Sequence, residues 1–193
     1  MKTARRLEQF PEYVHARLAK IVAETEHATG RKVRNLGIGS PDVAPSPLYL
    51  EKLSEFIRDK NAHLYPGYGG TNELKDAIRT WYKKRFDVAL EADEVLVLLG
   101  AKDGIAHLPL ALADAGQEIL VPDPGYPAFS GSALLVGARP VLYDVAARSR
   151  SYLDRLEENL SDRTAFVWAN FPSNPTGDVA TQEELKRLVE IAK

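Results

Sequence analysis

The second half of the chain alternates short apolar runs with segments of helical pattern. Each apolar run is too short for a good helix and is typical of a buried strand. The runs cover residues 95–99, 118–121, 140–143 and 164–169, and the helix-like segments between them cover residues 108–113, 129–136 and 153–160. This β-α-β-α order predicts an α/β fold with a mainly parallel sheet and helices on both of its faces.

The first part of the chain instead predicts helices joined by loops. Residues 11–29 have the apolar spacing of an amphipathic helix, and Gly30 follows where a C-terminal cap belongs. Ser46, followed by a proline, predicts the start of a second helix, and Thr71 predicts the start of a third. The second helix is expected to bury one apolar stripe, which consists of Leu50, Leu53, Phe56 and Ile57.

The pattern changes near residues 88–93, where helical segments give way to apolar runs. We therefore expect an N-terminal arm and helical segment over residues 1–90 and part of an α/β domain over residues 91–193. A capping box that begins with Thr181 predicts the last helix. Because no strand follows this helix in the sequence, we expect the sheet to be incomplete. Pro109 predicts either a kink in the helix around it or a late start of that helix.

Composition narrows the possible functions. With 45% hydrophobic residues, 27% charged residues and a net charge of -2, the chain has an ordinary globular composition and no basic block for binding nucleic acid. The absence of cysteine excludes disulfides and cysteine nucleophiles, and the four widely spaced histidines predict no metal site. No apolar run suits a membrane span or a signal peptide, so we expect a cytoplasmic protein.

Three polar loops each follow a predicted strand. They cover residues 100–104, 122–127 and 170–177. Because the carboxyl ends of parallel strands meet at one edge of a sheet, we expect these loops to converge on one crevice. An ordinary loop is the alternative for residues 170–177, where Asn174-Pro175 is an X-Pro bond in a tight turn and a candidate for the cis isomer.

Each of these loops offers a different chemical group. The first opens a helix, whose free N–H groups and positive dipole end suit a phosphate, with Lys102 as an added cation. Tyr126 lies between a glycine and a proline and could stack on a planar ring, with simple packing as the alternative. Asn174 could donate its amide N–H to a phenolate-like oxygen. Together these groups predict a pocket for a phosphorylated heteroaromatic cofactor.

The order of these motifs resembles the N-terminal half of the class I/II, fold-type I, pyridoxal-phosphate-dependent aminotransferases, and most closely their LL-diaminopimelate aminotransferase-like members. The most specific piece is the Asn-x-Pro-x-Asn-Pro-Thr-Gly pattern at residues 170–177. Further segments in the family's order and spacing are residues 36–42, 65–70, 100–104 and 122–127. The resemblance implies an incomplete large domain of that fold, pyridoxal 5'-phosphate as cofactor, and amino acids and 2-oxo acids as substrates.

The resemblance also implies roles for residues at matching positions. Asn174 would hydrogen-bond the ring hydroxyl of the cofactor, and Tyr126 would stack on its pyridine ring. Ala101 and Lys102 would hold the phosphate, mostly through backbone N–H groups, although the family often has serine or threonine there. Tyr65 would reach the phosphate of the cofactor in the neighbouring subunit, which implies a homodimer.

By resemblance, Gly39 would lie against the substrate carboxylate. The Schiff-base lysine of the family's Ser-x-Ser-Lys signature has no match in this sequence. We therefore expect no catalytic residue here and an N-terminal fragment that is inactive alone. The alternatives are a fold-type I β-lyase or decarboxylase, and a non-catalytic module that binds a phosphorylated ligand or assembles with another chain.

Overall fold

The computed structural model describes residues 2–37, 39–146 and 151–193. The chain divides into two units by the contacts between its residues. The first unit contains residues 1–11 and 98–193, and the second contains residues 12–97. The domain boundary that we expect near residue 90 stays a prediction, because compact units defined by contacts need not be folding domains.

The first unit is built on a three-stranded parallel sheet. Its central strand β1 (Glu118–Asp123) pairs with β2 (Arg139–Asp144) on one side and with β3 (Thr164–Val167) on the other. These strands are three of the four predicted apolar runs. The prediction of an α/β fold with a parallel sheet is therefore confirmed.

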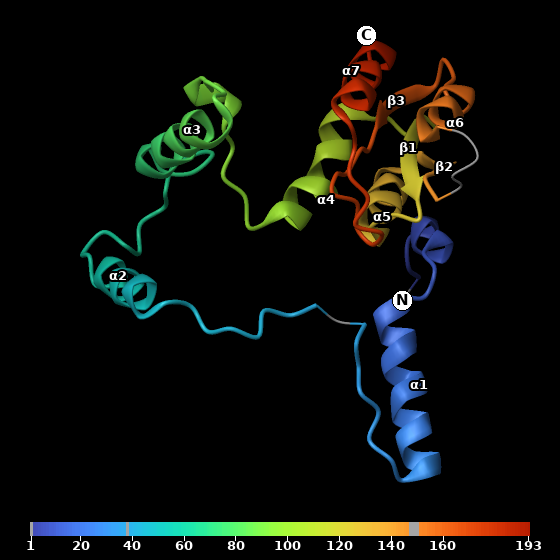
Figure 1. Cartoon of the computed structure of the whole chain (residues 1–193), viewed down its shortest axis with the longest axis horizontal. Helices are drawn as coiled ribbons and strands as arrows, with labels where there is room; N and C mark the ends of the chain where they lie inside the picture. Colours follow the sequence, from blue (N-terminus) through green and yellow to red (C-terminus); the bar gives the residue numbers. More distant parts are fainter. Residues whose placement is uncertain (1, 38, 147–150) are drawn as a thin grey trace. The chain divides into compact units, whose positions relative to one another are not determined.

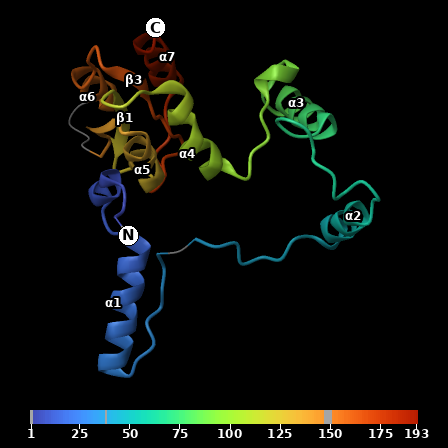
Figure 2. The ribbon, with the colours of Figure 1, turned by 180° about the vertical axis from the view of Figure 1, so that it is seen from behind.

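Helices cover both faces of this sheet. Since alternate residues of a strand point to opposite faces, Ile119 and Val121 lie on one face and Leu120 lies on the other. The first face packs against α4 (Ala101–Leu112) and α5 (Pro127–Val136), and the second against α6 (Tyr152–Glu158) and α7 (Gln182–Ile191). Figure 1, and Figure 2 from behind, show these helices around the strands.

A short helix from the start of the chain also belongs to the first unit. This 3-10 helix, η1 (Arg5–Gln9), packs against α5. The guanidinium of Arg6 donates a hydrogen bond of 2.8 Å to the carbonyl oxygen of Leu135, at the end of α5. Phe10 lies against Gly131, where an added Cβ would come within 3.5 Å of the ring. The chain start thus covers part of the outer surface of α5.

The fourth predicted strand, at residues 95–99, is not formed. Val95 is buried, whereas Leu96 and Leu99 are 67% and 98% exposed. A strand forms only where a second strand offers backbone groups to pair with, and none of the described strands lies beside this run. The N–H of Val97 donates instead to the carbonyl oxygen of Gly69, at 3.1 Å. The strand prediction was wrong because the run has the composition of a strand but no described strand to pair with.

The helix around Pro109 starts early. It begins at Ala101, directly after the Gly100 cap, and Pro109 lies buried near its C-terminal end. The alternative of a late helix start is therefore wrong. A proline there removes one N–H from the helix, and the helix ends three residues later.

The second unit contains three α-helices and a 3-10 helix within its described residues. They are α1 (Val14–Thr29), α2 (Pro47–Ile57), α3 (Asn72–Phe86) and η2 (Ala92–Glu94). The predicted end of α1 and the predicted starts of α2 and α3 are confirmed, since Gly30 ends α1 with φ 65° and the hydroxyls of Ser46 and Thr71 each accept an N–H of the helix that follows. The first helix begins at Val14, three residues later than predicted. Nowhere in residues 2–37, 39–146 and 151–193 does a helix combine the length and apolar character that a membrane crossing needs.

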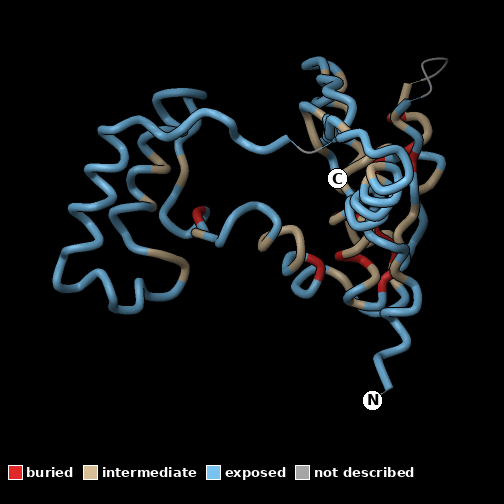
Figure 3. Tube along the Cα trace, turned by 90° about the horizontal axis from the view of Figure 1, so that it is seen from below, coloured by how far each residue is buried: buried red, intermediate tan, exposed pale blue. Residues whose placement is uncertain are grey.

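The predicted burial of the apolar stripe on α2 is wrong in this chain. The exposed fraction of its four residues runs from 45% for Leu53 to 70% for Phe56. Figure 3 colours most of the second unit as exposed; apart from Val95, the described buried residues belong to the first unit. An apolar stripe indicates which side of a helix is suited to burial, but burial also requires another element that packs against that side.

A buried carboxylate closes the amino end of the sheet. The side chain of Glu118, at the start of β1, is 2% exposed. It accepts a hydrogen bond of 2.6 Å from Arg139 of β2 and one of 2.8 Å from the hydroxyl of Ser161, and it pairs with Arg163. The hydrogen bond from Arg139, followed by that from Ser161, lowers the pKa of Glu118 below its ordinary value, although burial opposes this shift.

This network predicts a pH-dependent stability. Because the folded-state pKa of Glu118 is lowered, its contribution is present above the unfolded pKa of about 4.3 and is lost as the pH falls through the folded pKa. We expect Glu118→Gln to lower the free energy of unfolding in urea at pH 7, and the difference from wild type to shrink as the pH falls below about 4.3. The exposed Glu190→Gln is the matched control. A difference that stays constant with pH would contradict the prediction.

Candidate functional site

The start of α4 is shaped by Gly100. This residue caps the helix with φ 95° and ψ 164°, a backbone region that essentially only glycine occupies. An added Cβ would meet no atom within 4 Å, so the backbone conformation, rather than space, requires glycine. No side chain caps the helix at Gly100. The first N–H groups of α4 therefore face the end of the helix where an anion is favoured.

An acidic residue shares this helix start. One carboxylate oxygen of Asp103 accepts the N–H of Leu99 at 3.1 Å, and the other lies 2.8 Å from Nδ1 of His107. Asp103 is thus held by partners on and next to its own helix. A phosphate at the same helix start would lie near this negative charge, so the ammonium of Lys102 gains importance as the balancing cation.

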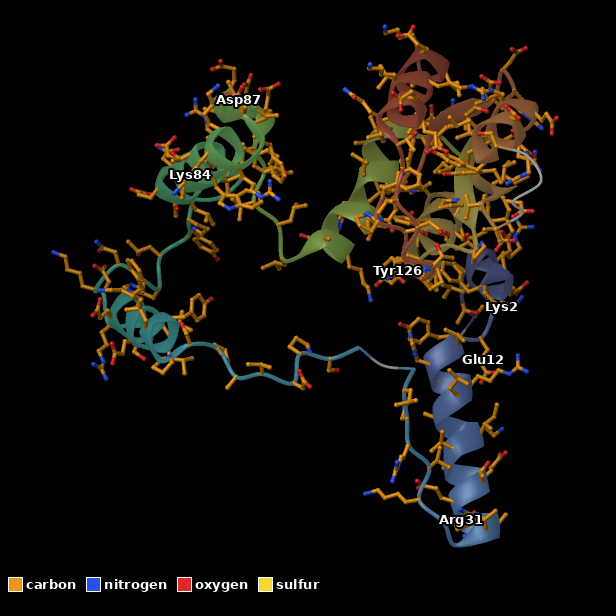
Figure 4. All side chains as sticks on the ribbon, in the orientation of Figure 1. Lys2, Glu12, Arg31, Lys84, Asp87 and Tyr126 are labelled. Atoms are coloured by element: carbon orange, nitrogen blue, oxygen red, sulfur yellow. The ribbon has the colours of Figure 1, made fainter. Side chains whose placement is uncertain are left out.

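The structure brings two of the expected site residues together. The ammonium of Lys102 lies 5.6 Å from the centroid of the Tyr126 ring, within the range of a cation–π contact. Lys102 is in the first turn of α4, and Tyr126 is the N-cap of α5, where Figure 4 labels it. The candidate phosphate position and the candidate stacking ring are therefore neighbours.

The loop before Tyr126 has no room for a side chain. A Cβ on Gly125 would come within 2.2 Å of the carbonyl oxygen of Pro122. Only glycine allows the chain to turn this tightly from the end of β1 into α5. Pro127 at the first position of α5 then fixes the direction in which the helix leaves. Tyr126 thus sits between two residues that restrict the backbone.

Two aromatic residues that sequence reasoning missed link Tyr126 to β3. The ring of Phe129 meets Tyr126 edge-on, with centroids 5.9 Å apart, and stacks on Trp168 with centroids 4.9 Å apart and 24° between the planes. Phe129 lies three residues after Tyr126 on the same side of α5, a spacing that could have indicated their contact. No sequence signal indicates the contact between Phe129 and Trp168.

The loop after β3 carries Asn174. Its backbone N–H donates to Oδ1 of Asn170 at 3.1 Å, and Gly177 closes the turn by donating to the carbonyl oxygen of Ser173 at 2.7 Å. The Asn174-Pro175 bond is cis, as predicted. Because β3 pairs directly with β1 in a parallel sheet, this loop and Tyr126 leave the same edge.

Ala101 begins α4 beside Lys102, so the two expected phosphate contacts stand together in the first turn. The remaining two site residues, Gly39 and Tyr65, belong to the second unit. Tyr65 is fully exposed, and a Cβ on Gly39 would meet no atom within 4 Å. The site described here therefore consists of residues of the first unit.

A cavity of about 320 Å³ lies on the α6 and α7 side of the unit, beside the loop that carries Asn174. Its lining includes Tyr143, Tyr152, Asn170 and Glu184, and none of the expected cofactor contacts. Burial, with a smaller effect of Glu184, raises the pKa of Tyr152 to about 12, so its hydroxyl stays protonated at neutral pH. The cavity is thus lined by the loop that carries Asn174, but not by Lys102 or Tyr126.

Known proteins resemble this chain in both sequence and fold. The chain is 34% identical to LL-diaminopimelate aminotransferase of Halothermothrix orenii over 100% of this chain and 50% of that protein. It is 37% identical to the enzyme of the same name from Aquifex aeolicus, over 97% of this chain and 49% of that protein. Its structure matches the aspartate aminotransferase from Rhizobium meliloti with a TM-score of 0.90 and 28% identity, over 100% of this chain and 48% of that chain.

The chain thus spans about half the length of the curated relatives it matches. Residues 31–193 also match the family model for aminotransferase class I and II. This match contains every expected contact, from Gly39 to Asn174. The parallel sheet, the uncapped start of α4 and the aromatic residue beside it agree with the same assignment. The chain belongs to the class I and II aminotransferase family, whose members depend on pyridoxal phosphate.

Proposed function

We propose that this chain is the N-terminal part of an aminotransferase that transfers an amino group between an amino acid and a 2-oxo acid. The observation that carries the proposal is the position of Lys102, at the start of α4 and 5.6 Å from the Tyr126 ring centroid. A helix start with a cation suits a phosphate, and an aromatic ring beside it suits a planar heterocycle. These are the two ends of a pyridoxal phosphate molecule.

The residues present fit this cofactor. Ala101 and Lys102 would hold its phosphate, Tyr126 would stack on its ring, and Asn174 would donate to its ring hydroxyl. When bound, pyridoxal phosphate would supply the electron sink that allows an amino group to leave one carbon and join another. The part of this chain is to bind and orient the cofactor at the carboxyl edge of the sheet.

The remaining contacts concern substrate and assembly. Gly39 would lie against the substrate carboxylate, where the lack of a side chain permits close approach. Tyr65 would reach the cofactor phosphate of a second subunit in a homodimer, and its full exposure leaves it available for such a contact. Relatives named LL-diaminopimelate aminotransferases support an amino acid with a second charged end as the substrate class.

Binding of pyridoxine 5'-phosphate tests the cofactor site. This probe has the ring, ring hydroxyl and phosphate but no aldehyde, so surface lysines cannot capture it covalently. We expect wild type to bind it and Tyr126→Ala to weaken binding about tenfold, the effect of losing about 1.4 kcal/mol of stacking. Equilibrium dialysis measures both affinities, and Tyr13→Ala in the second unit is the matched control. Equal binding by wild type and Tyr126→Ala would contradict the proposal.

A second prediction concerns activity. The sequence contains no match to the Ser-x-Ser-Lys signature that carries the attachment lysine of the family. We expect this chain, supplied with pyridoxal phosphate, an amino acid and a 2-oxo acid, to form product no faster than the same mixture without protein. Proton NMR of the product 2-oxo acid measures the rate. Sustained turnover above that background would show that the chain is catalytically complete.

A third prediction concerns assembly. The outer side of β3 has no partner strand among the described residues, and the apolar stripe of α2 is exposed. Unpaired strand edges and exposed apolar faces favour association. We expect sedimentation at micromolar concentrations to show a self-associated species, and Phe56→Glu to shift it toward monomer more than the exposed Glu51→Gln does. A single monomeric species of the wild type would contradict this expectation.

A further inference from the structure

The orientation of the Tyr126 ring depends on a row of aromatic side chains. Tyr126 meets the edge of Phe129 at 84° between planes, and Phe129 stacks on Trp168. Phe129 is 5% exposed, so it has little space in which to move. Because close-packed rings turn only together with their neighbours, the position of Trp168 is transmitted through Phe129 to Tyr126.

Trp168 is itself held at its backbone on two sides. Its N–H donates to the carbonyl oxygen of Leu120 at 2.9 Å, which joins it to the central strand. Its carbonyl oxygen accepts a hydrogen bond of 2.7 Å from the hydroxyl of Tyr143, which is 1% exposed. Burial raises the pKa of Tyr143, so this hydroxyl remains a donor at neutral pH. Trp168 cannot shift without breaking its contacts to β1 and β2.

The same residue stands at the start of the loop that carries Asn174. Trp168 is followed two residues later by Asn170, whose Oδ1 accepts the N–H of Asn174 at 3.1 Å. The hydrogen bond from Tyr143 to Trp168 therefore fixes the point from which this loop departs. Trp168 is thus connected to Tyr126 through its ring and to Asn174 through its backbone.

We propose that Trp168 is a positioning residue that fixes, at once, the plane of the Tyr126 ring and the departure of the Asn174 loop. The inference rests on the proposed function, in which Tyr126 and Asn174 contact one cofactor ring. A flat ring bound by stacking on one side chain and by a hydrogen bond from another requires both to hold a fixed relative orientation. Trp168 can provide this fixed orientation because its ring packs against Phe129, beside Tyr126, and its backbone precedes the loop of Asn174.

The indole nitrogen of Trp168 helps to identify which feature of this side chain serves the positioning role. Nε1 of Trp168 is buried and has no hydrogen-bond partner among the described residues. A buried donor without a partner destabilises a protein, so no hydrogen bond within the described residues explains the presence of tryptophan. The broad ring face, which stacks on Phe129, remains as the useful feature. Phenylalanine at position 168 should therefore retain the positioning role, whereas leucine should not.

The experiment compares variants of the full chain with pyridoxine 5'-phosphate as the probe. We expect Trp168→Leu to raise the Kd about tenfold and Trp168→Phe to raise it no more than about twofold. We also expect Trp168→Leu to abolish or invert the circular dichroism that the bound probe acquires in its own absorption band. Measured with saturating probe and expressed per bound molecule, this signal reports the orientation of the bound ring, which a loss of global stability alone would not change. Trp81→Leu, which alters the other tryptophan, is the matched control.

A milder variant covers the case in which Trp168→Leu does not fold. Tyr143→Phe removes only the hydroxyl that holds the carbonyl of Trp168, and we expect it to weaken binding about threefold and to alter the induced signal. Wild-type affinity and an unchanged signal in folded Trp168→Leu, or in Tyr143→Phe when the leucine variant is unfolded, would overturn the inference alone. Failure of the wild type to bind the probe would overturn the proposed function and this inference with it.

Discussion

The burial of the central strand β1 from Glu118 to Pro122 is the constraint on which the first unit depends. Apolar side chains on both of its faces need a helix layer on each side, and its two neighbours must pair with it in parallel. Because parallel strands run in the same direction, their carboxyl ends lie at one edge of the sheet, so the loops that follow these strands lie at that edge. Lys102 and Tyr126 meet because α4 and α5 cover the same face of this strand. The candidate site is therefore a consequence of how the core is packed.

Local signals predicted the helices of the second unit well, because caps act over a few residues. Ser46 and Thr71 each bind an N–H of the helix that they start, and the glycine after α1 adopts the left-handed conformation that few other residues tolerate. The strand expected at residues 95–99 depended instead on a partner strand, which sequence composition does not specify. The stripe on α2 likewise needed a covering element. Both errors concern contacts distant in sequence, and the local chemistry of neither segment was misread.

The candidate site was likewise predicted only in part from the sequence. The parallel sheet placed the loops at residues 122–127 and 170–177 at one edge, whereas the loop at residues 100–104 follows no strand in the structure. The resemblance to a family supplied the roles of Tyr126 and Asn174. The contacts that orient these two residues were not predicted. Phe129 of α5 meets Trp168, the residue after β3, and the hydroxyl of Tyr143 on β2 reaches the carbonyl of Trp168 although β2 and β3 are not paired. Such contacts depend on side-chain positions in three dimensions, and one sequence carries no periodic signal for them.

The ionic network at Glu118 has a consequence that follows from its place in the sheet. It closes the amino end of β1, whereas Tyr126 follows the carboxyl end, and a strand of six residues spans about 20 Å. Substitutions separated by more than about 10 Å and sharing no partner generally have additive effects. Residues around Glu118 can therefore change the acid tolerance of the fold independently of ligand recognition, which leaves sequence variation at the two ends of β1 free to follow different selective pressures.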